Sequence, residues 1–135
     1  MREVICTLLL VVACARPSQG PVAIAYDKET CAYCHMLIGD PRFAAQIITD
    51  AGDVYSFDDP GCLFRFVAEQ HPHVRATWFR DSRRDRWLAS GEVAFAHEAK
   101  TPMGWGFAAV DRNTPGARTY QETMRSVTDS AGAAR

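Results

Sequence analysis

Asp53-Val-Tyr-Ser-Phe57-Asp-Asp-Pro60 joins a short alternating apolar segment to two aspartates and a proline. The alternation over Val54–Phe57 predicts a strand with one buried face. Either of the next two aspartates can cap a helix that has Pro60 in its first turn, and apolar positions continue this helix to about Gln70. The stretch therefore predicts a strand that passes directly into a helix.

Strand-like segments lie on both sides of this stretch. Residues Phe43 to Thr49 are rich in β-forming residues, and Asp50-Ala-Gly-Asp53 supplies a turn, so we expect a hairpin with the strand that follows. His71-Pro72 ends the helix, and residues 74–79 are again strand-like. The first half of the chain is thus expected to run strand, strand, helix, strand.

A similar pattern returns in Gly106-Phe-Ala-Ala-Val-Asp-Arg-Asn-Thr-Pro115, where a strand again runs through aspartate toward a proline. We expect Trp87-Leu88 to open this second half, strands at 93–96 and 105–110, and a helix from Asn113-Thr114-Pro115 to about Val127. Short strands joined by hairpins beside helices favour an α+β fold. The chain is predicted to form one compact domain of two small, similar ββα(β) halves.

Composition restricts the class of protein. A chain of 135 residues that is 47% hydrophobic can bury the core of a single domain. The formal net charge of -1 provides no basic field for nucleic acid, so we expect no nucleic-acid partner. The one basic cluster, residues 80–86, is interrupted by Asp81 and Asp85 and is interpreted first as a solvated turn, second as a docking patch.

The N-terminus has the features of a secretory signal. Arg2 precedes an apolar run from Val4 to Val12 that is too short to span a bilayer, and Cys14 follows small residues as in the lipobox of bacterial lipoproteins. We interpret residues 1–13 as the signal, 14–25 as a lipidated start and tether, 26–128 as the domain and 129–135 as a frayed tail. This predicts an extracytoplasmic protein held on the membrane by lipid on Cys14. A plain secretory signal and a cytoplasmic N-terminal helix are the alternatives.

Three cysteines remain for chemistry in the mature domain: Cys31, Cys34 and Cys62. In an oxidising compartment, the simplest expectation is a disulfide between Cys31 and Cys34, with Cys62 buried as a small apolar residue. A Cys-x-x-Cys pair also serves zinc, iron–sulfur, redox and copper sites. The spacing alone does not choose among them.

Met36 favours copper, because a thioether is a poor ligand for Zn(II) and a good one for Cu(I). It follows Cys31-Ala-Tyr-Cys34-His35 directly, and His35 is a further, less certain candidate because imidazole suits copper and zinc equally. Met103 is displayed in the tight loop Thr101-Pro-Met-Gly-Trp-Gly106 rather than on a core face. The residues therefore indicate a site for a soft metal ion.

Four blocks together resemble the NosL family of nitrous oxide reductase accessory proteins. They are Cys31-Ala-Tyr-Cys34-His-Met36, Arg42-Phe-Ala-Ala-Gln46, Phe57-Asp-Asp-Pro-Gly-Cys62-Leu and Pro102-Met103-Gly-Trp-Gly106. Members are extracytoplasmic lipoproteins that carry Cu(I) to the copper–sulfur centre of nitrous oxide reductase. The resemblance implies one Cu(I) ion per chain, bound best by Cys34, Met36 and Met103, with Cys31 close behind and Cys62 less certain. The family commonly has glycine where His35 stands.

The same resemblance implies a client copper enzyme as partner, and possible contacts with membrane components of its maturation pathway. No nucleophile or carboxylate pair is recognisable, so no enzymatic activity is expected. Two other classes of function stay open. A zinc-stabilised domain would use Cys31, Cys34, Cys62 and one histidine, and it would unfold without metal. A thiol-disulfide oxidoreductase would use Cys31 and Cys34, but it expects them at the start of a helix after a buried strand.

Overall fold

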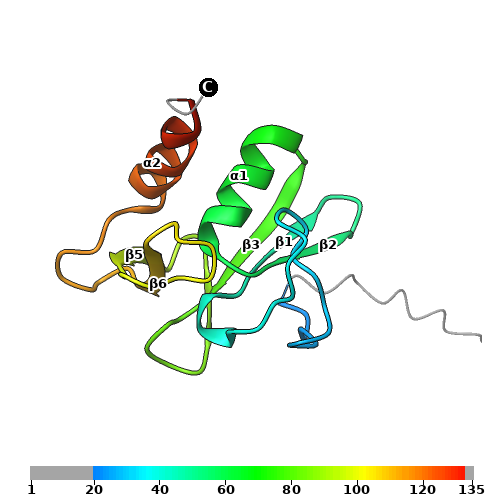
Figure 1. Cartoon of the computed structure of the whole chain (residues 1–135), viewed down its shortest axis with the longest axis horizontal. Coiled ribbons are helices and arrows are strands. Elements are labelled where there is room, and N and C mark those ends of the chain that lie inside the picture. The colour runs from blue at the N-terminus through cyan, green and yellow to red at the C-terminus, as the bar shows by residue number, and fades with distance from the viewer. Residues whose placement is uncertain (1–19, 133–135) are drawn as a thin grey trace, which may run out of the picture.

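The computed structural model describes residues 20–132, so the predicted signal and lipidated Cys14 lie outside the described residues. Its elements confirm the α+β class (Figure 1). In chain order they are a 3-10 helix η1 (Pro41–Phe43), β1 (Ala45–Thr49), β2 (Val54–Phe57), α1 (Pro60–Gln70), β3 (Val74–Arg80), β4 (Trp87–Ala89), β5 (Val93–His97), β6 (Phe107–Asp111) and α2 (Tyr120–Gly132). Two ββα units, β1–β2–α1 and β5–β6–α2, are therefore present.

Antiparallel pairing places the strands in two sheets. The larger sheet has the order β2-β1-β3-β4, and β5 pairs with β6 in a separate two-stranded sheet. Residues 87–89 thus complete the first sheet rather than opening the second half. The predicted first strand is shorter than expected, because Pro41–Phe43 forms a 3-10 turn whose N-cap Asp40 accepts a hydrogen bond from the Arg42 amide.

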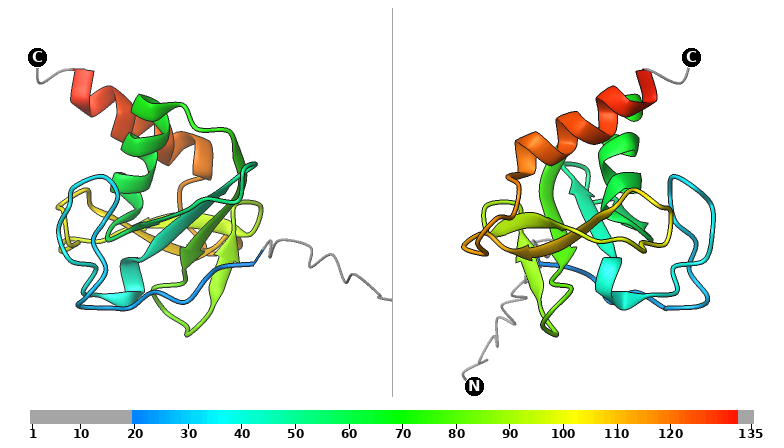
Figure 2. Two further views of the ribbon diagram at one scale, coloured as in Figure 1. Left: turned by 90° about the vertical axis from the view of Figure 1, so that its right-hand side faces the viewer. Right: turned by 60° about the vertical axis from the view of Figure 1, so that its left-hand side comes forward.

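Both helices lie on the same side of the strands (Figures 1 and 2). A cluster of aromatic rings joins them to the two sheets. The ring of Phe64 on α1 lies 5.8 Å from Phe79 of β3, 5.4 Å from Phe95 of β5 and 5.2 Å from Tyr120 of α2, between centroids. Phe64 and Phe79 are fully buried. One side chain of α1 therefore contacts both sheets and the second helix.

The opposite face of the larger sheet is covered by the chain before the first strand. Gln46 of β1 is buried, and its side-chain amide accepts from the Val22 N–H (2.9 Å) and donates to the Val22 carbonyl (3.0 Å). Ile24 is also buried. The sequence predicts residues 14–25 as lipidated start and tether, and the structure corrects this for residues 22–24. The Gln46 side chain bonds the backbone of Val22, much as a neighbouring strand would, and so holds these residues on the domain.

The second helix begins later than predicted, at Tyr120 rather than near Pro115. Residues 112–119 instead form turns in which Gly116 has a φ of 76° and Arg118 makes an isolated bridge to Phe95. The helix start has a local signal in the sequence: Thr119 accepts from the Glu122 amide and Glu122 accepts from the Thr119 amide, as in a capping box. The helix also continues to Gly132, so residues 129–132 are helical rather than frayed.

Replacement of Thr119 by alanine is expected to cost about 1 kcal/mol of unfolding free energy, because it removes this cap. Thr114→Ala, at the start that the sequence pattern favoured, is expected to change the stability by less than about 0.5 kcal/mol. Urea unfolding of the two variants measures both values. Equal losses would contradict the observed helix start.

The charged turn after β3 links the two halves of the fold. Arg86 donates to the buried carboxylate of Asp81 (2.9 Å) and to Asp111 at the end of β6 (2.7 Å). The Ser82 amide donates to the carbonyl of Ala109 in β6 (2.8 Å). Part of the turn is therefore structural rather than simply solvated. Within residues 20–132, no helix has the length and apolar character needed to cross a membrane.

Candidate metal centre

Three thiols meet where the loop before η1 touches the start of α1. The Sγ atoms of Cys31, Cys34 and Cys62 all lie within 4.8 Å of one another, and all three cysteines are free thiols. A metal ion that binds three sulfurs at about 2.3 Å, the length of a zinc–thiolate bond, holds them about 4 Å apart in a trigonal plane. Small side-chain movements are sufficient to close these sulfurs around one ion.

A tight loop presents two of these cysteines. Thr30 and Leu37 form an isolated bridge that closes the loop, and the Cys31 amide donates to the carbonyl of Met36 (2.8 Å). The Ala32 amide donates to Ser56 of β2 (2.9 Å), which holds the loop against the larger sheet. The Cys-x-x-Cys pair thus lies in a turn and not at a helix start, unlike the setting that a thiol-disulfide oxidoreductase expects.

The backbone conformation at His35 is one that glycine adopts easily. The φ of His35 is 63°, in the left-handed region that L-residues other than glycine, asparagine and aspartate seldom adopt. Its amide donates to the Cys31 carbonyl (3.0 Å), and its side chain is exposed. In the part of the chain that the structure describes, no histidine or carboxylate joins the three sulfurs. The structure therefore brings Cys62, but not His35, into the cluster.

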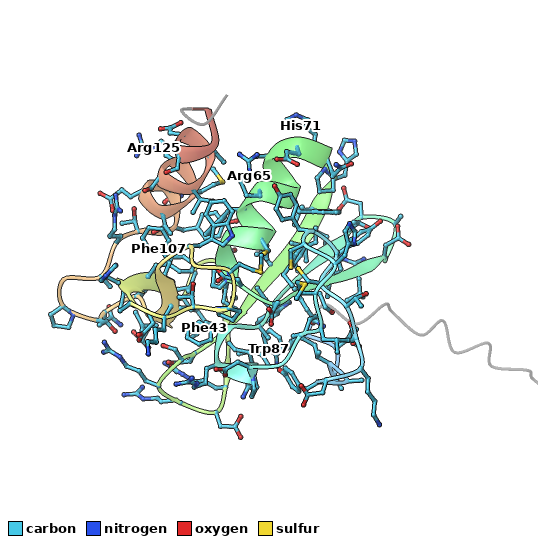
Figure 3. All side chains as sticks on the ribbon, viewed as in Figure 1. Phe43, Arg65, His71, Trp87, Phe107 and Arg125 are labelled. Atoms are coloured by element: carbon cyan, nitrogen blue, oxygen red, sulfur yellow. The ribbon has the colours of Figure 1, made fainter. Side chains whose placement is uncertain are left out.

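Cys62 reaches the cluster from the first turn of α1. It follows the N-cap Asp59 by three residues, and its side chain is 0% exposed. A helix N-terminus favours negative charge on a nearby sulfur, but the hydrogen bond to Cys31 and burial outweigh this effect at Cys62 and raise its pKa. A second contact holds the loop to the same helix, because the Tyr33 hydroxyl bonds Glu69 (3.1 Å) and accepts from Arg65 Nε (3.3 Å) (Figure 3, Arg65).

A hydrogen bond joins the side chains of the buried residues Cys31 and Cys62. A hydrogen bond from the Cys62 thiol, helped by the amides of Cys34, Asp58 and Tyr33, lowers the pKa of Cys31 to about 5. The same hydrogen bond, together with burial, raises the pKa of Cys62. Burial is the main cause that raises the pKa of Cys34. The three shifts therefore favour the thiolate form at Cys31 over Cys34 and Cys62.

This arrangement predicts an acid titration of one thiolate. The ultraviolet absorbance of the thiolate is expected to fall as the pH drops through about 5, and Cys31→Ser is expected to remove that transition. Since the pKa of Cys31 is lower in the folded chain than in the unfolded chain, its contribution to stability is complete above the ordinary thiol pKa of about 8.5 and is lost as the pH falls. A titration near pH 8 in the wild type would contradict the lowered pKa of Cys31.

The two candidate methionines lie at the surface. Met36 is 59% exposed and Met103 is 40% exposed, whereas Cys31 is 0% exposed. Their neighbours Leu37 and Pro102 line one cleft of about 380 Å3, so the two loops face each other across it. The Met103 amide donates to Asp59 at the start of α1 (3.1 Å). His71, in contrast, caps the opposite end of α1 (Figure 3).

These features define a small α+β domain with a cluster of thiols that can hold a metal ion. Residues 21–130 match the NosL family, so the chain belongs to that family. It is also similar in fold to a solved structure described as the copper chaperone NosL from Shewanella denitrificans, with 17% sequence identity and a TM-score of 0.55. That match covers 84% of this chain and 89% of the other. No curated protein sequence matches the chain.

Proposed function

We propose that this protein is a metallochaperone that binds one Cu(I) ion per chain and delivers it to a client enzyme. The observation that carries the proposal is the convergence of three free cysteine sulfurs within 4.8 Å, from two separate segments. Thiolate and thioether ligands select Cu(I) over harder ions. A structural zinc site would need a fourth ligand, and among residues 20–132 the cluster contains three cysteines and no histidine or carboxylate.

Cys34 is the proposed point of entry for the ion. Cys31 and Cys62 are completely buried, while Cys34 is partly exposed, and the thioethers of Met36 and Met103 lie on exposed loops. We assign Cys31, Cys34 and Cys62 as thiolate ligands, with Met36 and Met103 as thioether ligands on the open side. An acceptor ligand can then replace a thioether first and Cys34 next. Each exchange replaces one copper–ligand bond by a similar one, so no enzymatic step is required.

The proposed location and client rest on the family resemblance and the N-terminal pattern. Lipid on Cys14 would hold the domain on the outer side of the membrane. The client would be a copper enzyme, by resemblance nitrous oxide reductase with its copper–sulfur centre, reached with or without membrane components of its maturation pathway.

Anaerobic titration of the reduced protein with Cu(I) against a chromogenic chelator tests the proposal. The wild type is expected to bind one equivalent, and Cys34→Ser combined with Met36→Leu is expected to abolish binding that competes with the chelator. Met124→Leu is the matched control, because Met124 lies on α2 and packs against the core. Unchanged binding by the double variant would refute the proposal. The empty protein should also stay folded, whereas a zinc-stabilised domain would not.

A further inference from the structure

The buried carboxylate of Asp59 connects the helix that presents Cys62 to the loop that presents Met103. Its Oδ1 accepts from the Gly61 amide (2.9 Å) and its Oδ2 accepts from the Met103 amide (3.1 Å). The side chain of Thr101 also bonds to this carboxylate. Asp59 is 0% exposed, so water does not compete for these bonds. One side chain therefore sets the distance between two segments that are far apart in the sequence.

A close contact between Gly61 and Trp105 holds the same two segments together. A Cβ atom added at Gly61 would lie 2.1 Å from Cγ and 2.3 Å from Cδ1 of Trp105. The indole thus occupies the space that any other residue at this position would need. The position requires glycine because of this neighbour, and its contact places the loop directly against the first turn of α1.

Hydrogen bonds within residues 101–106 also hold the backbone of this loop in one conformation. This backbone conformation fixes the position of the Met103 Cα, from which the side chain extends. The Gly104 amide donates to the Thr101 carbonyl (3.1 Å), and the Gly106 amide donates to the Thr101 hydroxyl (3.3 Å). Pro102 stands between them as the first central residue of the turn. The Met103 amide that bonds Asp59 belongs to this turn.

We propose that Asp59 and Gly61 are positioning residues that fix the Met103 thioether beside the thiol cluster, so that it can close the copper site. This inference rests on the proposed function, because it assigns to the two residues a role in the ligand set of the same ion. The capping of α1 and the attachment of Met103 use different oxygens of one carboxylate. The two roles can therefore be separated by substitution.

Asp59→Ser separates them, because a serine hydroxyl can still cap the helix but is too short to hold the other loop. The variant is expected to bind Cu(I) about 10- to 100-fold more weakly, the range typical for loss of a hydrogen bond that orients a metal ligand. Gly61→Ala, which displaces Trp105, is expected to have the same effect. Gly91→Ala is its control, since an added Cβ there meets nothing within 4 Å.

A double-mutant cycle with Met103→Leu decides whether the effect passes through Met103. We expect Asp59→Ser and Gly61→Ala to cause no further loss of Cu(I) affinity in the Met103→Leu background. With methyl-labelled methionine, the Met103 resonance is expected to shift when Cu(I) is added to the wild type, and to shift much less in either variant. A merely structural role would leave that shift unchanged in the folded, copper-loaded fraction.

Additive affinity losses, or a full Met103 shift in the variants, would overturn the inference while leaving the proposed function intact. If Asp59→Ser does not fold, Gly61→Ala decides by the same two measurements. A wild type that fails to bind Cu(I) would instead refute the proposed function, and this inference with it. Titration with Cu(I) alone thus separates the two failures before any variant is compared.

Discussion

Cys62→Ala is expected to weaken Cu(I) binding by at least about 100-fold, more than loss of a hydrogen bond around a ligand usually costs. The reason is that Cys62 contributes one of the three sulfurs that lie within 4.8 Å of one another. Its thiol also donates the hydrogen bond that lowers the pKa of Cys31. The substitution therefore removes a ligand and makes a second ligand harder to deprotonate.

Competition with a Cu(I) chelator at two pH values measures this effect. On binding, the wild type must release the protons of Cys34 and Cys62, and the variant must release those of Cys34 and Cys31, so the loss of affinity is expected to be similar at pH 6 and pH 8. Urea unfolding of the empty variant provides the control, since alanine in this buried position removes one sulfur atom and should leave the fold intact. If Cys62→Ala bound Cu(I) with wild-type affinity, the ligands would come from the 31–36 loop and Met103 alone, and α1 would contribute none.

The elements that could be predicted from the sequence are those with strong local signals. The strand at 54–57 and the helix at 60–70 have the predicted bounds, because alternation, an aspartate cap and a proline in the first turn act within a few residues. The second helix begins later than Asn113-Thr114-Pro115 predicts, because the chain turns at this proline and the helix starts at the Thr119–Glu122 capping box. Strand β4 could not be assigned to a sheet, since its pairing with β3 is a tertiary contact.

The site residues, too, could be predicted only where the signal lies within one short segment of the sequence. Cys31, Cys34 and Met36 could be chosen because they are neighbours in one short segment with a recognisable mixture of thiols and a thioether. Cys62 was ranked lower, because nothing local shows that the first turn of α1 meets the 31–36 loop. One signal was present: Phe57-Asp-Asp-Pro-Gly-Cys62 places a thiol at a capped helix start directly after a strand. The role of Asp59 in holding Met103 depends on a contact across 44 residues and has no local signature.

Phe64→Ala is expected to destabilise the protein by about 3–5 kcal/mol, the usual cost of removing a buried aromatic ring. Phe64 contacts Phe79 of the larger sheet, Phe95 of the smaller sheet and Tyr120 of α2. Small domains are stable by only about 5–15 kcal/mol. The loss is therefore a large part of the total stability, and it falls on a ring that contacts both halves of the fold.

Phe66→Ala is the matched control on the same helix. That ring is only partly buried and packs on Tyr55 and Phe57 of β2, at centroid distances of 5.0 and 5.3 Å, so it touches the first half alone. Phe66→Ala should therefore lower the unfolding free energy less than Phe64→Ala does. Urea unfolding of the two variants without Cu(I) compares the two values. Because Cu(I) is proposed to bind the folded chain, saturating Cu(I) should raise the stability of both variants by mass action. A smaller cost for Phe64→Ala than for Phe66→Ala would mean that the two halves are held together elsewhere, with the Arg86 bridge to Asp111 the next contact to remove.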